Sequence, residues 1–141
     1  MRIEDLAAPS NCTKYEGTGV IVGKQGGSIS VINSNFTAND CSYIYSDRTP
    51  VEIAHSRFVE GKRSPYVNMK GSILSVFASD FSNTTNPSEL SNTTYLDYKT
   101  LGKAIKCEEC TQVVIKDSNF SKLQGNKGGA IYLKNSLETY L

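Results

Sequence analysis

The chain has no tryptophan, a single histidine and no long apolar run among its 141 residues. Hydrophobic residues make up 38% of it. The chain has no run of about 18 apolar residues, the length that a transmembrane helix needs. Runs of Ala, Leu, Glu and Lys at the 3.6-residue period are also missing, which argues against a helical bundle. Because 15 basic residues face 14 acidic ones, no charge excess points to nucleic acid or an anionic membrane.

Short polar residues are abundant instead. Ser, Thr and Asn number 39, and these residues favour turns over helix interiors. Five asparagines stand in Asn-x-Ser/Thr sequons, the acceptors for N-glycosylation in secreted proteins: Asn11, Asn35, Asn83, Asn92 and Asn119. The even number of cysteines, four, also fits an extracellular chain. The N-terminus lacks the apolar segment of a secretory signal, so we expect a mature piece of a longer, secreted, cell-surface protein.

Four segments share a pattern that ends in Ser-x-Phe. They are SISVINSNF (28–36), PVEIAHSRF (50–58), ILSVFASDF (73–81) and QVVIKDSNF (112–120). In each segment two aliphatic residues stand five and seven positions before the Phe, and this spacing places both on one face of a strand. The first three Phe residues are 22 and 23 positions apart. Internal repeats of this length indicate a solenoid.

The repeat therefore predicts an all-β parallel solenoid in which equivalent residues stack. The expected inner ladders are Ile29-Val51-Leu74-Val113, Val31-Ile53-Val76-Ile115 and Phe36-Phe58-Phe81-Phe120, with a file of Ser34-Ser56-Ser79-Ser118 at a turn. Fifteen residues before each Phe, an earlier strand is expected to place Ile21, Tyr43, Tyr66 and Ile105 inside. The alternative is an antiparallel meander with coincidental spacing. A leucine-rich repeat consensus is absent, and a propeller blade needs about twice this length.

We divide the chain into an N-terminal edge or partial coil (1–18) and a coiled region (19–141) interrupted by an inserted loop at about 84–101. Long excursions from a solenoid often carry its interactions, and Tyr95 and Tyr98 make this loop a possible contact surface. Solenoids need a polar terminal cap, whereas the last residues include Leu137 and Leu141. We therefore expect a fragment of a longer chain, or an end that another chain covers.

These repeats resemble the pectin-lyase-like β-helix proteins, and among them the surface proteins whose coils alternate GGA-[ILV] with Phe-x-x-Asn. The residues that carry the resemblance are GGAI (128–131), GGSI (26–29), FTAN (36–39) and DSNFSKLQGNKGGAIYL (117–133). Chlamydial polymorphic outer-membrane proteins and surface proteins of ciliates contain such runs. The resemblance implies a right-handed parallel β-helix, here of about five coils of 22–26 residues. It also implies an extracellular, non-catalytic stalk or adhesion segment.

Little in the sequence points to catalysis. The six Asp residues include no adjacent pair, and Asp80 is expected to stack between Arg57 and Asn119 in a solvated file. His55, the single histidine, falls in a turn without a nucleophile motif. The Cys107-x-x-Cys110 spacing lacks the second pair of a zinc ribbon, because Cys12 and Cys41 stand singly. Four cysteines allow three pairings; we favour 107–110 with 12–41.

We therefore expect no catalytic residue, no metal site, no cofactor and no nucleic-acid partner. The predicted role is structural or adhesive, as a segment of a secreted, N-glycosylated surface protein or extracellular filament. Its expected partners are covalent glycans and further coils, from the same or neighbouring chains, added end to end or laterally. The alternative is part of a carbohydrate-active β-helix, of the polysaccharide lyase or hydrolase kind, whose catalytic residues lie outside this segment.

Overall fold

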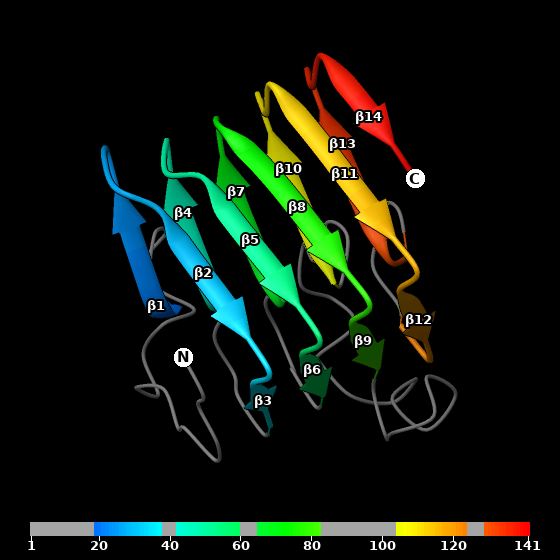
Figure 1. The fold of residues 1–141 in the computed structure, drawn as a ribbon. Coiled ribbons are helices and arrows are strands. Elements are labelled where there is room, and N and C mark those ends of the chain that lie inside the picture. The colour runs from blue at the N-terminus through cyan, green and yellow to red at the C-terminus, as the bar shows by residue number, and fades with distance from the viewer. Residues whose placement is uncertain (1–18, 38–41, 60–64, 83–103, 124–128) are drawn as a thin grey trace, which may run out of the picture.

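The structure is a parallel β-solenoid of about four turns (Figure 1). It is a computed structural model that describes residues 19–37, 42–59, 65–82, 104–123 and 129–141. Each turn runs through a strand of sheet A, a strand of sheet B and a short strand of sheet C before the next turn begins. The antiparallel meander is excluded, because every strand pair in the three sheets is parallel.

In the part of the chain that the structure describes, sheets A and B have five strands each and sheet C has four. Sheet A is ordered β1 (Gly19–Lys24), β4 (Ser42–Asp47), β7 (Val67–Lys70), β10 (Ile105–Glu108) and β13 (Ile131–Lys134). Sheet B is ordered β2 (Ile29–Ile32), β5 (Val51–Ala54), β8 (Ile73–Phe77), β11 (Gln112–Lys116) and β14 (Glu138–Tyr140). Sheet C is ordered β3 (Asn35–Phe36), β6 (Arg57–Val59), β9 (Asp80–Ser82) and β12 (Asn119–Ser121). About five coils were expected; the structure has about four turns, with β13 and β14 in an incomplete final coil.

The aliphatic ladders of sheet B lie as the repeat predicts. Ile29, Val51, Leu74 and Val113 are in register, and so are Val31, Ile53, Val76 and Ile115. All eight side chains are buried, while the residues between them face outward or are half-buried. This period-2 alternation identifies one face of each strand as the core face. The core is therefore continuous along the solenoid axis rather than gathered at one point.

The four Phe residues of sheet C form a continuous aromatic stack inside the solenoid. Ring centroids are 4.7 Å apart for Phe36 and Phe58, 4.8 Å for Phe58 and Phe81, and 5.0 Å for Phe81 and Phe120. Interplanar angles are 2–4°. The centroid separations match the roughly 4.8 Å spacing of neighbouring strands, so the backbone ladder itself sets the ring separation.

Tyr43 and Tyr66 are buried, as expected, but their register was predicted wrongly by one residue. Ile44 and Val67, not the two tyrosines, pair in sheet A with Ile21 and Ile105. The reason is a shorter corner between sheets A and B in these two coils: three residues lie between Asp47 and Val51, whereas four lie between Glu108 and Val113. Each tyrosine hydroxyl donates a hydrogen bond to a backbone carbonyl at the end of its own coil, that of Val59 or Ser82.

The serine file closes the corner between sheets B and C. The backbone N–H of Ser34 donates to Ser56 Oγ at 3.2 Å, and Ser56 N–H donates to Ser79 Oγ at the same distance. Each hydroxyl in turn donates to the carbonyl two residues before it. The residue before each serine has a positive φ, between 49° and 52°. This left-handed corner turns the chain in a single residue, and the serine then satisfies the backbone that the turn leaves unpaired.

The ladder continues without interruption across segment 83–103. β7 pairs with β10 and β9 pairs with β12, although Phe81 and Phe120 are 39 residues apart. The predicted insertion therefore falls between two adjacent coils of one stack. Its proposed contact residues, Tyr95 and Tyr98, lie outside the described residues, as does the N-terminal segment 1–18.

Candidate functional site

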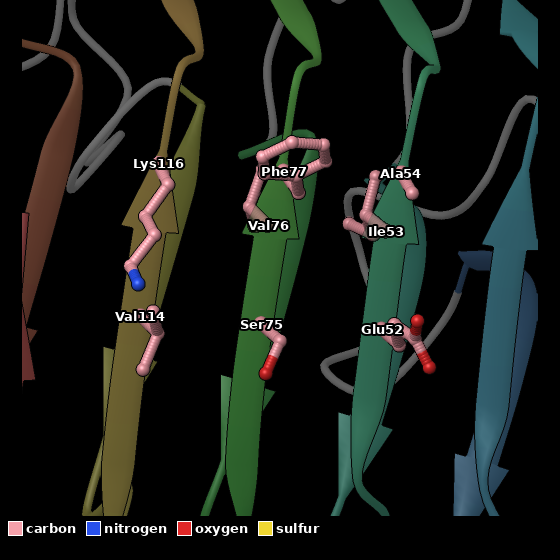
Figure 2. A pocket seen from close by; sticks show the side chains of 8 residues that line it. All are labelled: Glu52, Ile53, Ala54, Ser75, Val76, Phe77, Val114 and Lys116. Atoms are coloured by element: carbon pink, nitrogen blue, oxygen red, sulfur yellow. The ribbon is translucent and has the colours of Figure 1, made fainter.

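A shallow hollow of about 260 Å³ lies on the outer face of sheet B (Figure 2). It is lined by Glu52, Ile53, Ala54, Ser75, Val76, Phe77, Val114 and Lys116, which belong to β5, β8 and β11. Strand register sets its outward side chains in two rows. One row is Glu52, Ser75 and Val114; the other is Ala54, Phe77 and Lys116.

The lining of this hollow combines apolar and polar side chains. It offers the ring of Phe77, which is 45% exposed, together with one hydroxyl, one carboxylate and one ammonium group. Hydrolysis of a glycosidic bond commonly uses two carboxyl groups about 5–9.5 Å apart, and Glu52 is the one carboxylate among these lining residues. Sequence reasoning missed the hollow, because the outward residues that line it differ in type from coil to coil.

A polar file follows the outer face of sheet C, as predicted for Asp80. Arg57 Nε lies 3.6 Å from Asp80 Oδ2, and Asn119 Nδ2 donates to Asp80 Oδ1 at 3.3 Å. Strand register adds Asn35 beyond Arg57. Because the ion pair is largely exposed, its contribution to stability is small, about 0–1 kcal/mol.

The two described sequon asparagines differ in their surroundings. Asn119 is exposed, whereas Asn35 is half-buried. The Oδ1 atom of Asn35 is buried without a hydrogen-bond partner among the described residues. Asn119 therefore presents the more accessible acceptor. The other predicted acceptors, Asn11, Asn83 and Asn92, lie outside the described residues.

Cys107 and Cys110 form a disulfide across the corner between β10 and β11, as favoured from the sequence. Both residues are fully buried. Sheet register aligns Cys107, through Met69, with Ser46. In the coil of Ser46, the Ser46 Oγ donates a hydrogen bond to the carbonyl of Thr49 and accepts one from the Thr49 N–H. One corner position is thus closed by a hydrogen-bonded latch in one coil and by a covalent bond in another. Cys12 and Cys41 lie outside the described residues.

Replacing Cys107 by Ser and Cys110 by Thr is expected to destabilise the chain less than replacing both by Ala. A disulfide that closes so short a loop contributes about 1–2 kcal/mol, and the Ser/Thr pair can restore the latch of the Ser46 coil. Urea unfolding of both double variants, compared with the oxidised parent, measures the difference. Equal stability of the two variants would contradict the equivalence of the corners.

His55 occupies a left-handed turn position, with a φ of 50°, and is exposed as expected. Its ring meets the ring of Phe77 edge-on at 5.6 Å. This contact places His55 next to one residue of the hollow, but the imidazole is not among the groups that line it. The structure therefore gives it a turn role.

A file of alternating charge runs along the outer face of sheet A. Successive partners in the strand register are Lys24, Asp47, Lys70, Glu108 and Lys134. We call these five residues the charge file. Opposite charges on neighbouring strands stabilise a sheet pair, and like charges directly opposite destabilise it. The signs alternate in this order, while the two acidic members make ion pairs with nearby residues outside the file, Asp47 with Arg48 at 3.7 Å and Glu108 with Lys106 at 3.1 Å.

Among the described residues, no group of three or more His, Cys, Asp and Glu side chains is placed to hold a metal ion. In the same part of the chain no helix is long and apolar enough to cross a membrane. Comparison with protein-family models, curated proteins and solved structures found no match.

Proposed function

We propose that this chain is a non-catalytic structural or adhesive segment of a secreted, N-glycosylated surface protein or extracellular filament. The observation that carries the proposal is the continuous core: inner ladders and a Phe stack run the length of the described coils and hold a rod. A rod whose stability depends on inner residues leaves its outer surface free to carry glycans and contact neighbours. The resemblance to surface proteins with GGA-[ILV] and Phe-x-x-Asn repeats supports the same role.

The distribution of acidic residues also favours this role over cleavage of a polysaccharide. Among the strand residues, Asp47 and Glu108 belong to sheet A, Glu52 and Glu138 to sheet B and Asp80 to sheet C. In the described strand registers no acidic residue lies directly opposite another. A carbohydrate-active segment stays the second candidate, because the hollow beside Phe77 could bind a sugar ring.

Isolation of the native protein tests the proposal. Intact mass, peptide N-glycosidase treatment and negative-stain electron microscopy are expected to show an extracellular glycoprotein assembled end to end. A soluble, unglycosylated monomer that depolymerises a polysaccharide would establish the second candidate instead.

Passage of the chain through a eukaryotic secretory pathway is expected to modify Asn119. The exposed amide has two N–H groups, so a glycan can replace one hydrogen while the other still donates to Asp80. Enzymatic deglycosylation in ¹⁸O-labelled water, followed by peptide mass spectrometry, reads out the modified site. Asn119→Gln is expected to remove that signal and leave thermal unfolding unchanged. An unmodified Asn119 in secreted material would contradict the assignment.

A further inference from the structure

Strands β13 and β14 are the last of sheets A and B, and among the described residues no further strand pairs with their outer edge (Figure 1). Leu137 is 79% exposed and Leu141 75%, whereas the central core residues are almost fully buried. Ile131 and Leu133 continue the inner face of sheet A but are only half-buried. Covering such surface by a further strand would be favourable by the same hydrophobic burial that joins the existing coils.

At the corner between sheets A and B, a backbone N–H of each coil donates a hydrogen bond to a carbonyl of the following coil. Arg48 N–H donates to the Lys70 carbonyl, Gly71 N–H to Glu108 and Glu109 N–H to Lys134, at 2.7–2.8 Å. The acceptor in each case is the backbone carbonyl of a charge-file residue in the next coil. Asn135 is next in this series, and its N–H has no backbone acceptor among the described residues. An incoming parallel strand would supply that acceptor.

The charge file predicts which side chain the residue that supplies this carbonyl should carry. In the file, every described neighbour of a lysine is acidic: Asp47 lies beside Lys24 and Lys70, and Glu108 lies beside Lys70 and Lys134. Lys134 is exposed and has Glu108 on one side only. A further acidic residue on its open side would continue the alternation.

We infer that the β13–β14 edge docks a parallel coil carrying Asp or Glu opposite Lys134, with an aliphatic residue opposite Ile131 and a small or aliphatic residue opposite Leu133. The inference rests on the proposed structural role and names the partner that such a role requires. The same rule disfavours a second copy of this chain stacked in register. Its β1 strand would bring Lys24 against Lys134, and like charges directly opposite destabilise a strand pair.

Two peptides that differ in one charge test the inference. The first is residues 42–54, SYIYSDRTPVEIA, which spans a sheet A strand, a corner and a sheet B strand and carries Asp47 at the file position. The second is the same peptide with Asp47→Lys. Fluorescence anisotropy of the labelled peptides against the whole chain is expected to show about fivefold tighter binding of the Asp peptide, the size expected for exchanging a like-charge pair for an opposite-charge pair.

Substitution in the protein should reverse this preference. Lys134→Glu is expected to bind the Lys peptide about fivefold better than the Asp peptide. Lys122→Glu, which makes the same change of net charge at an exposed position next to sheet C, should keep the parent's preference. Thermal unfolding of both variants checks that they are folded.

The outcomes separate this inference from the proposed role. Equal binding of both peptides to parent and Lys134→Glu would overturn the charge rule while leaving coil stacking in place. Failure of both peptides to bind would overturn the docking edge itself. End-to-end assembly of the native protein, measured separately, decides the proposed role.

Discussion

Phe58→Ala is expected to lower the free energy of unfolding by about 4 kcal/mol, within the range for deletion of a buried Phe side chain. Phe58 is fully buried, and its ring lies between those of Phe36 and Phe81 at 4.7 and 4.8 Å. The strands on either side fix this spacing. The neighbouring rings therefore cannot close over the vacated space without breaking the backbone ladder. Urea unfolding followed by circular dichroism measures the loss.

Phe77→Ala is the matched control, because it deletes the same side chain from the outer face of sheet B. Phe77 is 45% exposed and contacts His55 edge-on, so its removal should cost about 1 kcal/mol or less. The two variants thus separate the Phe stack from a general effect of losing an aromatic ring. Similar losses in both would mean that the stack is not the dominant part of the core.

Ser56→Ala is expected to cost about 2 kcal/mol, although only one oxygen atom is removed. Ser56 Oγ accepts from Ser34 N–H at 3.2 Å and donates to the carbonyl of Ala54 at 2.9 Å. Both serines are buried. The substitution therefore removes the acceptor of a buried backbone N–H, and its desolvation is no longer compensated.

Ser75→Ala is the matched control for Ser56→Ala. Ser75 lies on the outer face of β8 and is half-buried, so its hydroxyl is within reach of water. Its loss should change stability by less than about 0.5 kcal/mol. Hydrogen exchange adds a local readout: Ser34 N–H should exchange faster in Ser56→Ala than in Ser75→Ala. Unchanged protection at Ser34 in both variants would show that the serine file does not hold the corner.

The Phe stack and the serine file could be foreseen because they depend on residues that recur at fixed spacing. Phe36, Phe58 and Phe81 recur at 22 and 23 residues, and only a stacked fold brings such positions together. The polar contact of Asp80 with Arg57 and Asn119 followed from the same register. A long-range contact is predictable from one sequence when both partners hold equivalent places in a repeat.

The sheet A register was less predictable because the pattern of inner residues does not show how many residues form the corner between sheets A and B. Counting back from Phe58 selects Tyr43, but the corner around Thr49 is one residue shorter, so Ile44 takes the ladder position. Tyr43 and Ile44 are both buried, so hydropathy alone does not show which of them occupies the ladder position. The choice depends on the length of the corner, because three residues lie between Asp47 and Val51 and four lie between Glu108 and Val113.

The outward features could not be foreseen from inner periodicity alone. Glu52, Phe77 and Lys116 differ from coil to coil, so no repeat draws attention to the hollow that they line. The charge file is hidden for a related reason: its members alternate in sign, and each looks like an ordinary surface charge in its own coil. Only the pairing of Asp47 with Lys70, and of Lys70 with Glu108, reveals the order.

The gradient of burial along the axis determines how this rod would respond to mechanical load. Each coil is bonded only to the coil before it and the coil after it, so tension on the chain beyond Tyr140 reaches β14 and β13 before any other strand. These strands hold the least buried side chains of the ladders. Pulling from this end would therefore peel the solenoid one coil at a time, and each released coil would lengthen the tether while the remaining coils stay folded.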